Sequence, residues 1–268
     1  MSRKHSHHDG RVPGYPAPRF RRRGIYLLPN LFTTAALFAG FFAITSARDG
    51  RFELAAIAIF VAMVLDGLDG RVARLTHTES DFGAQYDSLS DVVSFGLAPA
   101  LIMYDWALQP LANLGWLAVF IYAAATALRL ARFNSQLGSA DKRYFTGLAC
   151  PSAAAVMMGL VWVGEDLGLD GQQLVWVALC LTVISGVLMV SNILYLSFKA
   201  VDLKGRIPFV ALLAIVLGLG FASMDPPKVL FGLALGYALS GPAMSLWRRR
   251  QRAIRRRHQH ELDQPRED

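Results

Sequence analysis

The residues of this sequence best suited to chemistry are carboxylates that recur at fixed intervals inside two long apolar segments. Their pattern reads D-x2-D-G-x2-A-R-x8-G-x3-D-x3-D, and its aspartates are Asp66, Asp69, Asp87 and Asp91. Ionisable side chains are costly within a membrane and by default mark function there. Four facing carboxylates remain ionised only when cations neutralise them. Because all the ligands are oxygens, the pattern predicts hard divalent ions such as Mg²⁺, Mn²⁺ or Ca²⁺ and chemistry at a phosphoanhydride.

Small residues and one arginine accompany these acids. Gly70, Ala73 and Gly83 leave space where a flat nucleotide could approach a helix backbone, and Arg74 could pair with a phosphate. A competing explanation is that the small residues only allow helices to pack closely. That explanation accounts for the glycines and leaves the aspartates unexplained.

Helical spacing gathers the motif into two stripes. The positions from Asp66 to Arg74 that belong to the motif share one face of a helix, and those from Gly83 to Asp91 share one face of the next. The link over 76–81 is short, which favours antiparallel neighbours. We therefore expect the two acidic stripes to face each other.

The composition indicates a membrane protein of many spans. Apolar residues make up 54% of the 268 residues and charged residues 18%, although the net charge is +7. The basic residues cluster beside long apolar segments, where anionic lipid headgroups account for them. Nucleic acid is an unsuitable partner, because binding would require basic residues interleaved with stacking aromatics on a folded surface.

Segments long enough to span a bilayer predict an all-α integral membrane bundle of about eight transmembrane helices. These segments cover about 30–47, 53–75, 82–104, 112–133, 147–163, 174–198, 207–223 and 228–247. We expect three regions: a basic N-terminal tail with a juxtamembrane segment (1–29), a transmembrane catalytic domain (30–247) and a basic C-terminal tail (248–268).

Charge in the loops predicts the orientation of the bundle. Alternate loops and both tails carry 24 of the 27 lysine and arginine residues. The positive-inside rule places that side, with both termini and the acidic stripes, in the cytoplasm.

Two other classes of protein also hold acids within a membrane. A cation transporter would be expected to show repeated halves or broken helices, and neither is visible. An intramembrane metal-dependent prenyltransferase would carry two well-separated aspartate motifs, whereas here one helical hairpin holds all four acids. Both alternatives are less consistent with the pattern.

At every fixed position the motif resembles the signature of the CDP-alcohol phosphotransferases. The resemblance implies transfer of a phosphatidyl or related group from a CDP-alcohol to a second alcohol, with release of CMP. It implies two metal ions (Mg²⁺ or Mn²⁺, with Ca²⁺ possible in a crystal) bound by Asp66, Asp69, Asp87 and Asp91, the last acting as general base. The CDP-binding residues that it implies are Asp69, Gly70, Ala73, Arg74 and Gly83.

Flanking stretches from about residue 27 to 155 resemble the bacterial members of this family that use serine. Among them are Leu28-Pro-Asn-Leu-Phe-Thr-Thr and Leu128-Arg-Leu-Ala-Arg-Phe-Asn134. This implies CDP-diacylglycerol and L-serine as substrates, a homodimer, and the bacterial inner membrane as location. Glycerol 3-phosphate, an inositol phosphate or choline is the alternative acceptor.

The acceptor or a lipid phosphate requires further polar groups, and the loop after the fourth predicted span supplies candidates. They are Arg129, Arg132, Asn134, Lys142, Arg143 and Thr146. Ordinary positive-inside charge is an equally good explanation for the basic members of this set.

Overall fold

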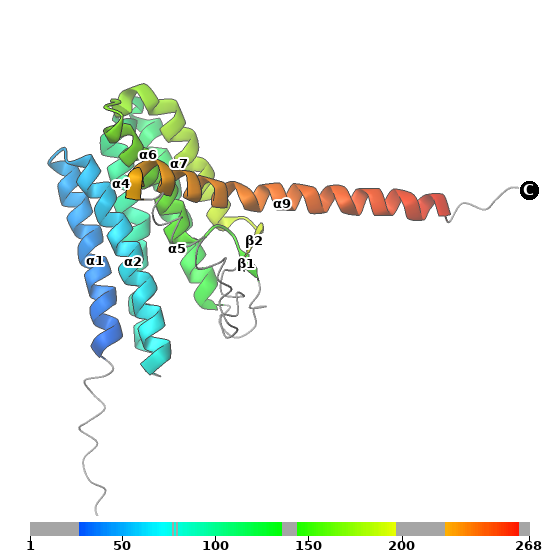
Figure 1. The fold of residues 1–268 in the computed structure, drawn as a ribbon, viewed down its shortest axis with the longest axis horizontal. Helices are drawn as coiled ribbons and strands as arrows, with labels where there is room; N and C mark the ends of the chain where they lie inside the picture. The colour runs from blue at the N-terminus through cyan, green and yellow to red at the C-terminus, as the bar shows by residue number, and fades with distance from the viewer. Residues whose placement is uncertain (1–26, 77, 79, 136–143, 197–222, 263–268) are drawn as a thin grey trace, which may run out of the picture.

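The computed structural model describes residues 27–76, 78, 80–135, 144–196 and 223–262. Long helices dominate this part of the chain (Figure 1). They are α1 (Leu27–Arg48), α2 (Phe52–Thr76), a continuous third helix, α5 (Asn113–Ser135), α6 (Cys150–Asp166), α7 (Val175–Val190) and α9 (Pro226–Leu262). The third helix comprises α3 (Asp81–Asp91), the π-helix η2 (Val92–Leu97), α4 (Ala98–Met103), the π-helix η3 (Tyr104–Leu108) and the 3₁₀ turn η4 (Gln109–Leu111).

Four of the described helices are long and apolar enough to cross a membrane. They cover Pro29–Arg48, Asp81–Leu111, Asn113–Ser135 and Gly171–Val190, the last including the 3₁₀ turn η5 (Gly171–Leu174). The protein is therefore an all-helical membrane protein in its main features. The expected segments 30–47, 53–75, 82–104, 112–133 and 147–163 each coincide with a helix to within a few residues, although the third continues to Leu111. The expected segment 207–223 lies almost wholly outside the described residues.

The core is built around α6, whose residues are mostly buried. Beside it, α1 and α2 pack along each other as a hairpin. Alanines recur on the buried face of α1 at Ala36, Ala39, Ala43 and Ala47. Small side chains at this spacing let two membrane helices approach closely and gain van der Waals contact.

The chain after α7 departs from the sequence prediction. The expected span 174–198 ends as a helix at Val190, and the strand β2 (Leu194–Leu196) follows it. β2 pairs antiparallel with β1 (Tyr144–Thr146), which precedes α6. A periodicity argument could not detect this pairing, because each strand has only three residues and its partner lies about 50 residues away.

Helix α9 also departs from the prediction. It runs across the bundle rather than along it, and it continues to Leu262, well beyond the expected end at residue 247 (Figure 1). Gly159 of α6 allows the crossing, because a Cβ there would lie 2.9 Å from the Phe231 ring and 3.0 Å from the Phe231 Cα atom.

Candidate metal centre

The turn between α2 and α3 fixes where the two acidic stripes begin. Thr78 N–H donates to the Ala73 carbonyl at 3.0 Å and closes the end of α2. Ser80 then caps α3, since its hydroxyl accepts from the Gly83 N–H at 3.0 Å. This N-cap is the local reason why a helix starts at Asp81.

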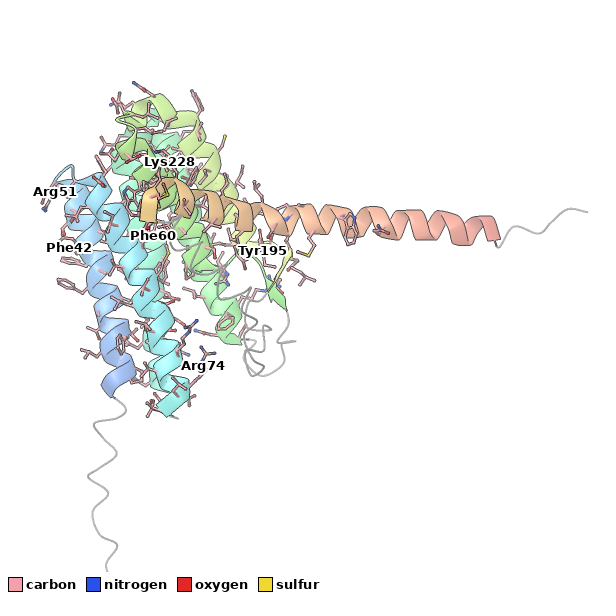
Figure 2. The ribbon with its side chains drawn as sticks, in the orientation of Figure 1. Phe42, Arg51, Phe60, Arg74, Tyr195 and Lys228 are labelled. Carbon is pink, nitrogen blue, oxygen red and sulfur yellow. The ribbon has the colours of Figure 1, made fainter. Side chains whose placement is uncertain are left out.

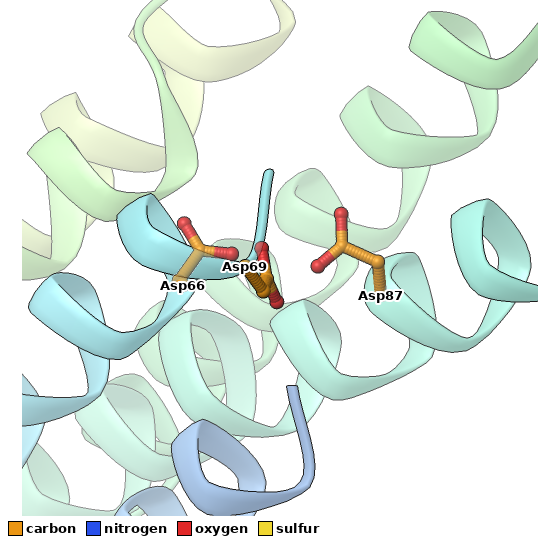
Figure 3. Close-up of side chains that lie close together, drawn as sticks. All are labelled: Asp66, Asp69 and Asp87. Atoms are coloured by element: carbon orange, nitrogen blue, oxygen red, sulfur yellow. The ribbon is translucent and has the colours of Figure 1, made fainter. Parts of the chain in front are cut away.

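The two acidic stripes meet as the spacing predicts. Asp66 and Asp69 of α2 and Asp87 of α3 each offer a carboxylate oxygen, and these oxygens all lie within 4.8 Å of one another (Figure 3). Asp69 is buried, while Asp66 and Asp87 are half-buried. We call these three residues the acidic cluster. Asp91, one turn after Asp87, lies beside Asp66 at the edge of the cluster.

Helix α1 contributes a residue that the sequence argument missed. The buried Thr33 hydroxyl donates to Asp69 Oδ2 at 2.7 Å and orients that carboxylate. Two serines of the third helix in turn bond to the backbone of α1, Ser90 to the Thr33 carbonyl at 3.2 Å and Ser94 to the Ala36 carbonyl at 3.1 Å. Thr33 lies in an apolar segment with no periodic signal of its own, and only the approach of α1 to α2 reveals its role.

The chemistry of the acidic cluster fits a hard divalent cation. Asp87 Oδ1 is buried and has no hydrogen-bond partner. Among the described residues, ion pairs join only Arg51 to Asp49 and Lys228 to Asp166 and Asp225, so none of the described lysines and arginines forms an ion pair with the cluster. A buried carboxylate oxygen without a partner is costly unless a cation binds it. Oxygen donors alone favour Mg²⁺, Mn²⁺ or Ca²⁺ over zinc.

Of the expected nucleotide-binding residues, Gly70 and Arg74 are exposed, whereas Asp69 is buried in the acidic cluster. A Cβ added at Gly70 would meet only the Arg74 side chain, at 4.0 Å, so close helix packing does not explain that glycine. Arg74 Nε donates to the Gly70 carbonyl at 2.7 Å, and its exposed side chain lies at the end of α2 opposite Arg51 (Figure 2). Ala73 is half-buried.

Gly83 differs from Gly70 in its surroundings. A Cβ at Gly83 would lie 3.1 Å from Ser80 Oγ and 3.5 Å from Asn30 Oδ1. Packing against the helix cap therefore accounts in part for this glycine, as the competing explanation proposed.

The expected acceptor residues differ in their hydrogen bonding, and two of them lie outside the described residues. Arg132 donates to Asn192 Oδ1 at 2.8 Å, and Asn134 donates to Ser88 Oγ at 3.0 Å. Arg129 donates to Cys150 Sγ at 3.2 Å, while its buried Nε has no partner. Thr146 is half-buried in β1, and Lys142 and Arg143 lie outside the described residues.

The chain is similar in sequence to one family model and to several known proteins. Residues 26–184 match the family model described as CDP-alcohol phosphatidyltransferase. A CDP-diacylglycerol–serine O-phosphatidyltransferase of Helicobacter pylori is 38% identical over 216 residues, covering 80% of this chain and 90% of the relative. A protein of the same description from Mycobacterium bovis is 32% identical over 223 residues, covering 81% and 78%. An archaetidylserine synthase of Methanothermobacter thermautotrophicus is 34% identical over 170 residues, covering 63% and 69%.

Proposed function

The chain belongs to the CDP-alcohol phosphatidyltransferase family, and from that premise we propose that it is a phosphatidylserine synthase. It transfers the phosphatidyl group of CDP-diacylglycerol to L-serine and releases CMP. The similarity to serine-specific relatives over about four-fifths of the chain is the observation that carries this proposal. An archaeal relative whose name also specifies a serine product supports serine as the shared acceptor.

The bonds of the proposed reaction assign a task to Asp91. A bond forms between the serine hydroxyl oxygen and the phosphorus that carries diacylglycerol, and the bond from that phosphorus to the CMP oxygen breaks. The proton of the serine hydroxyl goes to the Asp91 carboxylate. Asp91 suits this task because it is half-buried beside Asp66, where a metal-bound substrate would also lie, and a carboxylate can accept the proton of an alcohol.

Asp66, Asp69 and Asp87, together with Asp91, would hold two divalent ions, Mg²⁺ or Mn²⁺. When bound, such ions supply Lewis-acid stabilisation of the charge that develops on the diphosphate. The protein contributes the fixed positions of the carboxylates, and Thr33 contributes through its hydrogen bond to Asp69.

The open face of α2 would receive the nucleotide. Gly70 leaves the helix backbone accessible, since a Cβ there would meet only the Arg74 side chain among the described residues. Asp69, Ala73 and Gly83 are the other residues that we propose to bind the CDP group. Arg74 is exposed, and within the described part of the chain its side chain bonds to the Gly70 carbonyl alone, so its guanidinium could pair with a phosphate.

The acceptor site would lie near Arg129 of α5, which contacts Cys150 at the start of α6. The buried Arg129 Nε without a partner is a donor that a serine carboxylate or a lipid phosphate could satisfy. Arg132 and Asn134 already bond to Asn192 and Ser88, and they would shape the rim of the site, with Thr146. Lys142 and Arg143, which lie outside the described residues, remain candidates for binding the acceptor or a lipid phosphate.

For the whole protein, we propose an eight-span topology in the bacterial inner membrane, with both termini and the acidic cluster at the cytoplasmic face. The asymmetric distribution of lysine and arginine supports this orientation. A homodimer is the expected assembly, as the family resemblance implies, and anionic lipids would surround the basic tails.

A direct assay tests the function. Purified protein with Mn²⁺ and CDP-diacylglycerol is expected to release CMP when L-serine is added, and to form phosphatidylserine in equal amount. Glycerol 3-phosphate, an inositol phosphate and choline serve as comparison alcohols. CMP release with one of these but not with serine would contradict the acceptor, and no CMP with any alcohol would contradict the reaction class.

A further inference from the structure

The third helix changes its winding directly after Asp91. From Val92 to Leu97 it is a π-helix, in which the Ala98 N–H bonds to the Val93 carbonyl five residues earlier. Such turns are rare and concentrate at functional sites. A π-turn holds one extra residue, so it alters how the helix before it is rotated relative to the helix after it. The direction in which Asp87 and Asp91 face therefore depends on this turn.

Tyr122 of α5 holds the π-helix from one side. Its ring is fully buried, and its hydroxyl donates to the Phe95 carbonyl at 2.9 Å. A buried phenol requires such a partner, and a backbone carbonyl has a second lone pair to offer. Gly96 permits the close approach of α5, since a Cβ there would lie 3.1 Å from Thr126 Cγ2.

Helix α1 holds the π-helix from the other side. Ser94 Oγ donates to the Ala36 carbonyl, and Gly40 lets the two backbones approach so closely that a Cβ would lie 2.8 Å from Ser94 Cα. The same helix α1 carries Thr33, which binds Asp69. The π-helix is thus clamped between α5 and the helix that orients an acid of α2.

We propose that Tyr122 is a positioning residue for Asp87 and Asp91, acting through its hydrogen bond to the π-helical turn at Phe95. Loss of the hydroxyl releases one side of the clamp and lets the acids of α3 rotate away from those of α2. The part of the proposal that is measured by activity rests on the proposed function. The part that is measured by metal binding does not depend on it.

Tyr195 provides a matched control for a purely structural role. It is also fully buried, and its hydroxyl also donates to a backbone carbonyl, that of Ala238 at 3.1 Å. That bond joins β2 to α9, away from the third helix (Figure 2). Tyr122→Phe and Tyr195→Phe each delete one oxygen and one buried hydrogen bond of the same kind.

The test measures Mn²⁺ binding to the full-length protein without substrate, by the electron paramagnetic resonance signal of free Mn²⁺. Tyr122→Phe is expected to raise the Mn²⁺ dissociation constant roughly tenfold, the lower end of the effect of deleting an outer partner of a metal site. It is also expected to lower kcat with little change in KM for CDP-diacylglycerol. Tyr195→Phe is expected to bind Mn²⁺ like the wild type.

Two results would overturn the proposal: Tyr122→Phe with wild-type Mn²⁺ affinity, or equal losses of affinity in both tyrosine variants. If Tyr122→Phe does not fold, Ser94→Ala carries the test, because it releases the α1 side of the clamp and is expected to weaken Mn²⁺ binding in the same direction. Ser94→Ala with unchanged affinity would then overturn the proposal. A wild-type protein that binds Mn²⁺ but releases no CMP with serine contradicts the proposed function alone.

Discussion

Asp87 illustrates how a single residue can be unfavourable for the fold and necessary for the chemistry. One of its oxygens is buried without a hydrogen-bond partner, and Asp66 and Asp69 lie within reach of it. Like charges at this separation oppose ionisation of all three side chains. A bound cation would convert this repulsion into affinity, because it would be attracted to all three carboxylates.

Replacing Asp87 by Asn should therefore separate stability from activity. We expect CMP release to fall on the order of 10²–10³-fold, as when an electrostatic group of an active site is removed. The thermal midpoint in EDTA should stay equal or rise, because one of the repelling charges is gone. Mn²⁺ should raise the midpoint of the wild type by linkage and leave that of the variant nearly unchanged.

The control is Asp81→Asn, the same change at an exposed position of the same helix. It should retain CMP release and the stabilisation by Mn²⁺. An Asp87→Asn protein with wild-type activity would remove Asp87 from the metal centre.

Thr33→Val tests the hydrogen bond that orients Asp69. Valine keeps the shape of the side chain and deletes the hydroxyl that donates at 2.7 Å. We expect the apparent Mn²⁺ affinity, read from the metal dependence of CMP release, to fall about tenfold.

Thr34→Val is the matched control for Thr33→Val. The exposed Thr34 hydroxyl bonds to the Asn30 carbonyl and the Tyr86 hydroxyl, and among the described residues it has no hydrogen bond to an aspartate. Equal metal dependence in the two variants would show that the Thr33 hydroxyl does not orient Asp69.

At the scale of elements, the position of the acids depends on close contact between α1 and the third helix. Gly40 is a point of close approach, since a Cβ there would lie 2.7 Å from Ser94 Oγ and 2.8 Å from Ser94 Cα. A backbone atom cannot rotate out of the way as a flexible side chain can. Any side chain at Gly40 must therefore push the helices apart.

Gly40→Ala should lower both stability and activity. Overpacking of this kind costs about 1–3 kcal/mol, and we expect the thermal midpoint and CMP release to fall together. Gly232→Ala in α9 is the control, because nothing lies within 4 Å of its added Cβ and alanine favours a helix. A Gly40→Ala protein as stable as Gly232→Ala would contradict the tight contact.

At the scale of the whole molecule, the ends of the bundle differ in what they carry. Arg51 and Arg74 mark opposite ends of α2, and the acidic cluster lies toward the end with Arg74 (Figure 2). The other end holds the Lys228 ion pairs with Asp166 and Asp225. The loop charges predict that the end with Arg74 faces the cytoplasm. Because the acidic cluster lies toward that end, we predict that CDP-diacylglycerol reaches it from the cytoplasmic leaflet.

Cysteine labelling in intact cells tests this orientation. With Cys150 and Cys180 replaced by alanine, a cysteine introduced at Asp49, between α1 and α2, should react with a membrane-impermeant maleimide. A cysteine introduced at Asp81, the first residue of α3, should react only after the membrane is permeabilised. The reverse result would invert the topology and place the acidic cluster outside the cell.

The sequence by itself determined the local features of this protein. The spacing of Asp66, Asp69 and Asp87 placed them on helix faces, because a helix repeats every 3.6 residues whatever surrounds it. The length and polarity of the apolar segments indicated a helical membrane protein for a similar reason, since lipid requires backbone hydrogen bonds to close within each span. The match of the motif to its family followed from the same fixed intervals.

Only the tertiary structure decided which distant groups meet. Two contacts join residues of different helices: the hydrogen bond from Thr33 to Asp69 and the hydrogen bond from Tyr122 to the Phe95 carbonyl. Burial of Arg129 Nε without a hydrogen-bond partner is likewise a result of how the helices pack. The pairing of β1 with β2 and the crossing of α9 are contacts of the same kind. None of them leaves a periodic trace in the chain, because they depend on how whole helices approach one another and on the few small residues that let them do so.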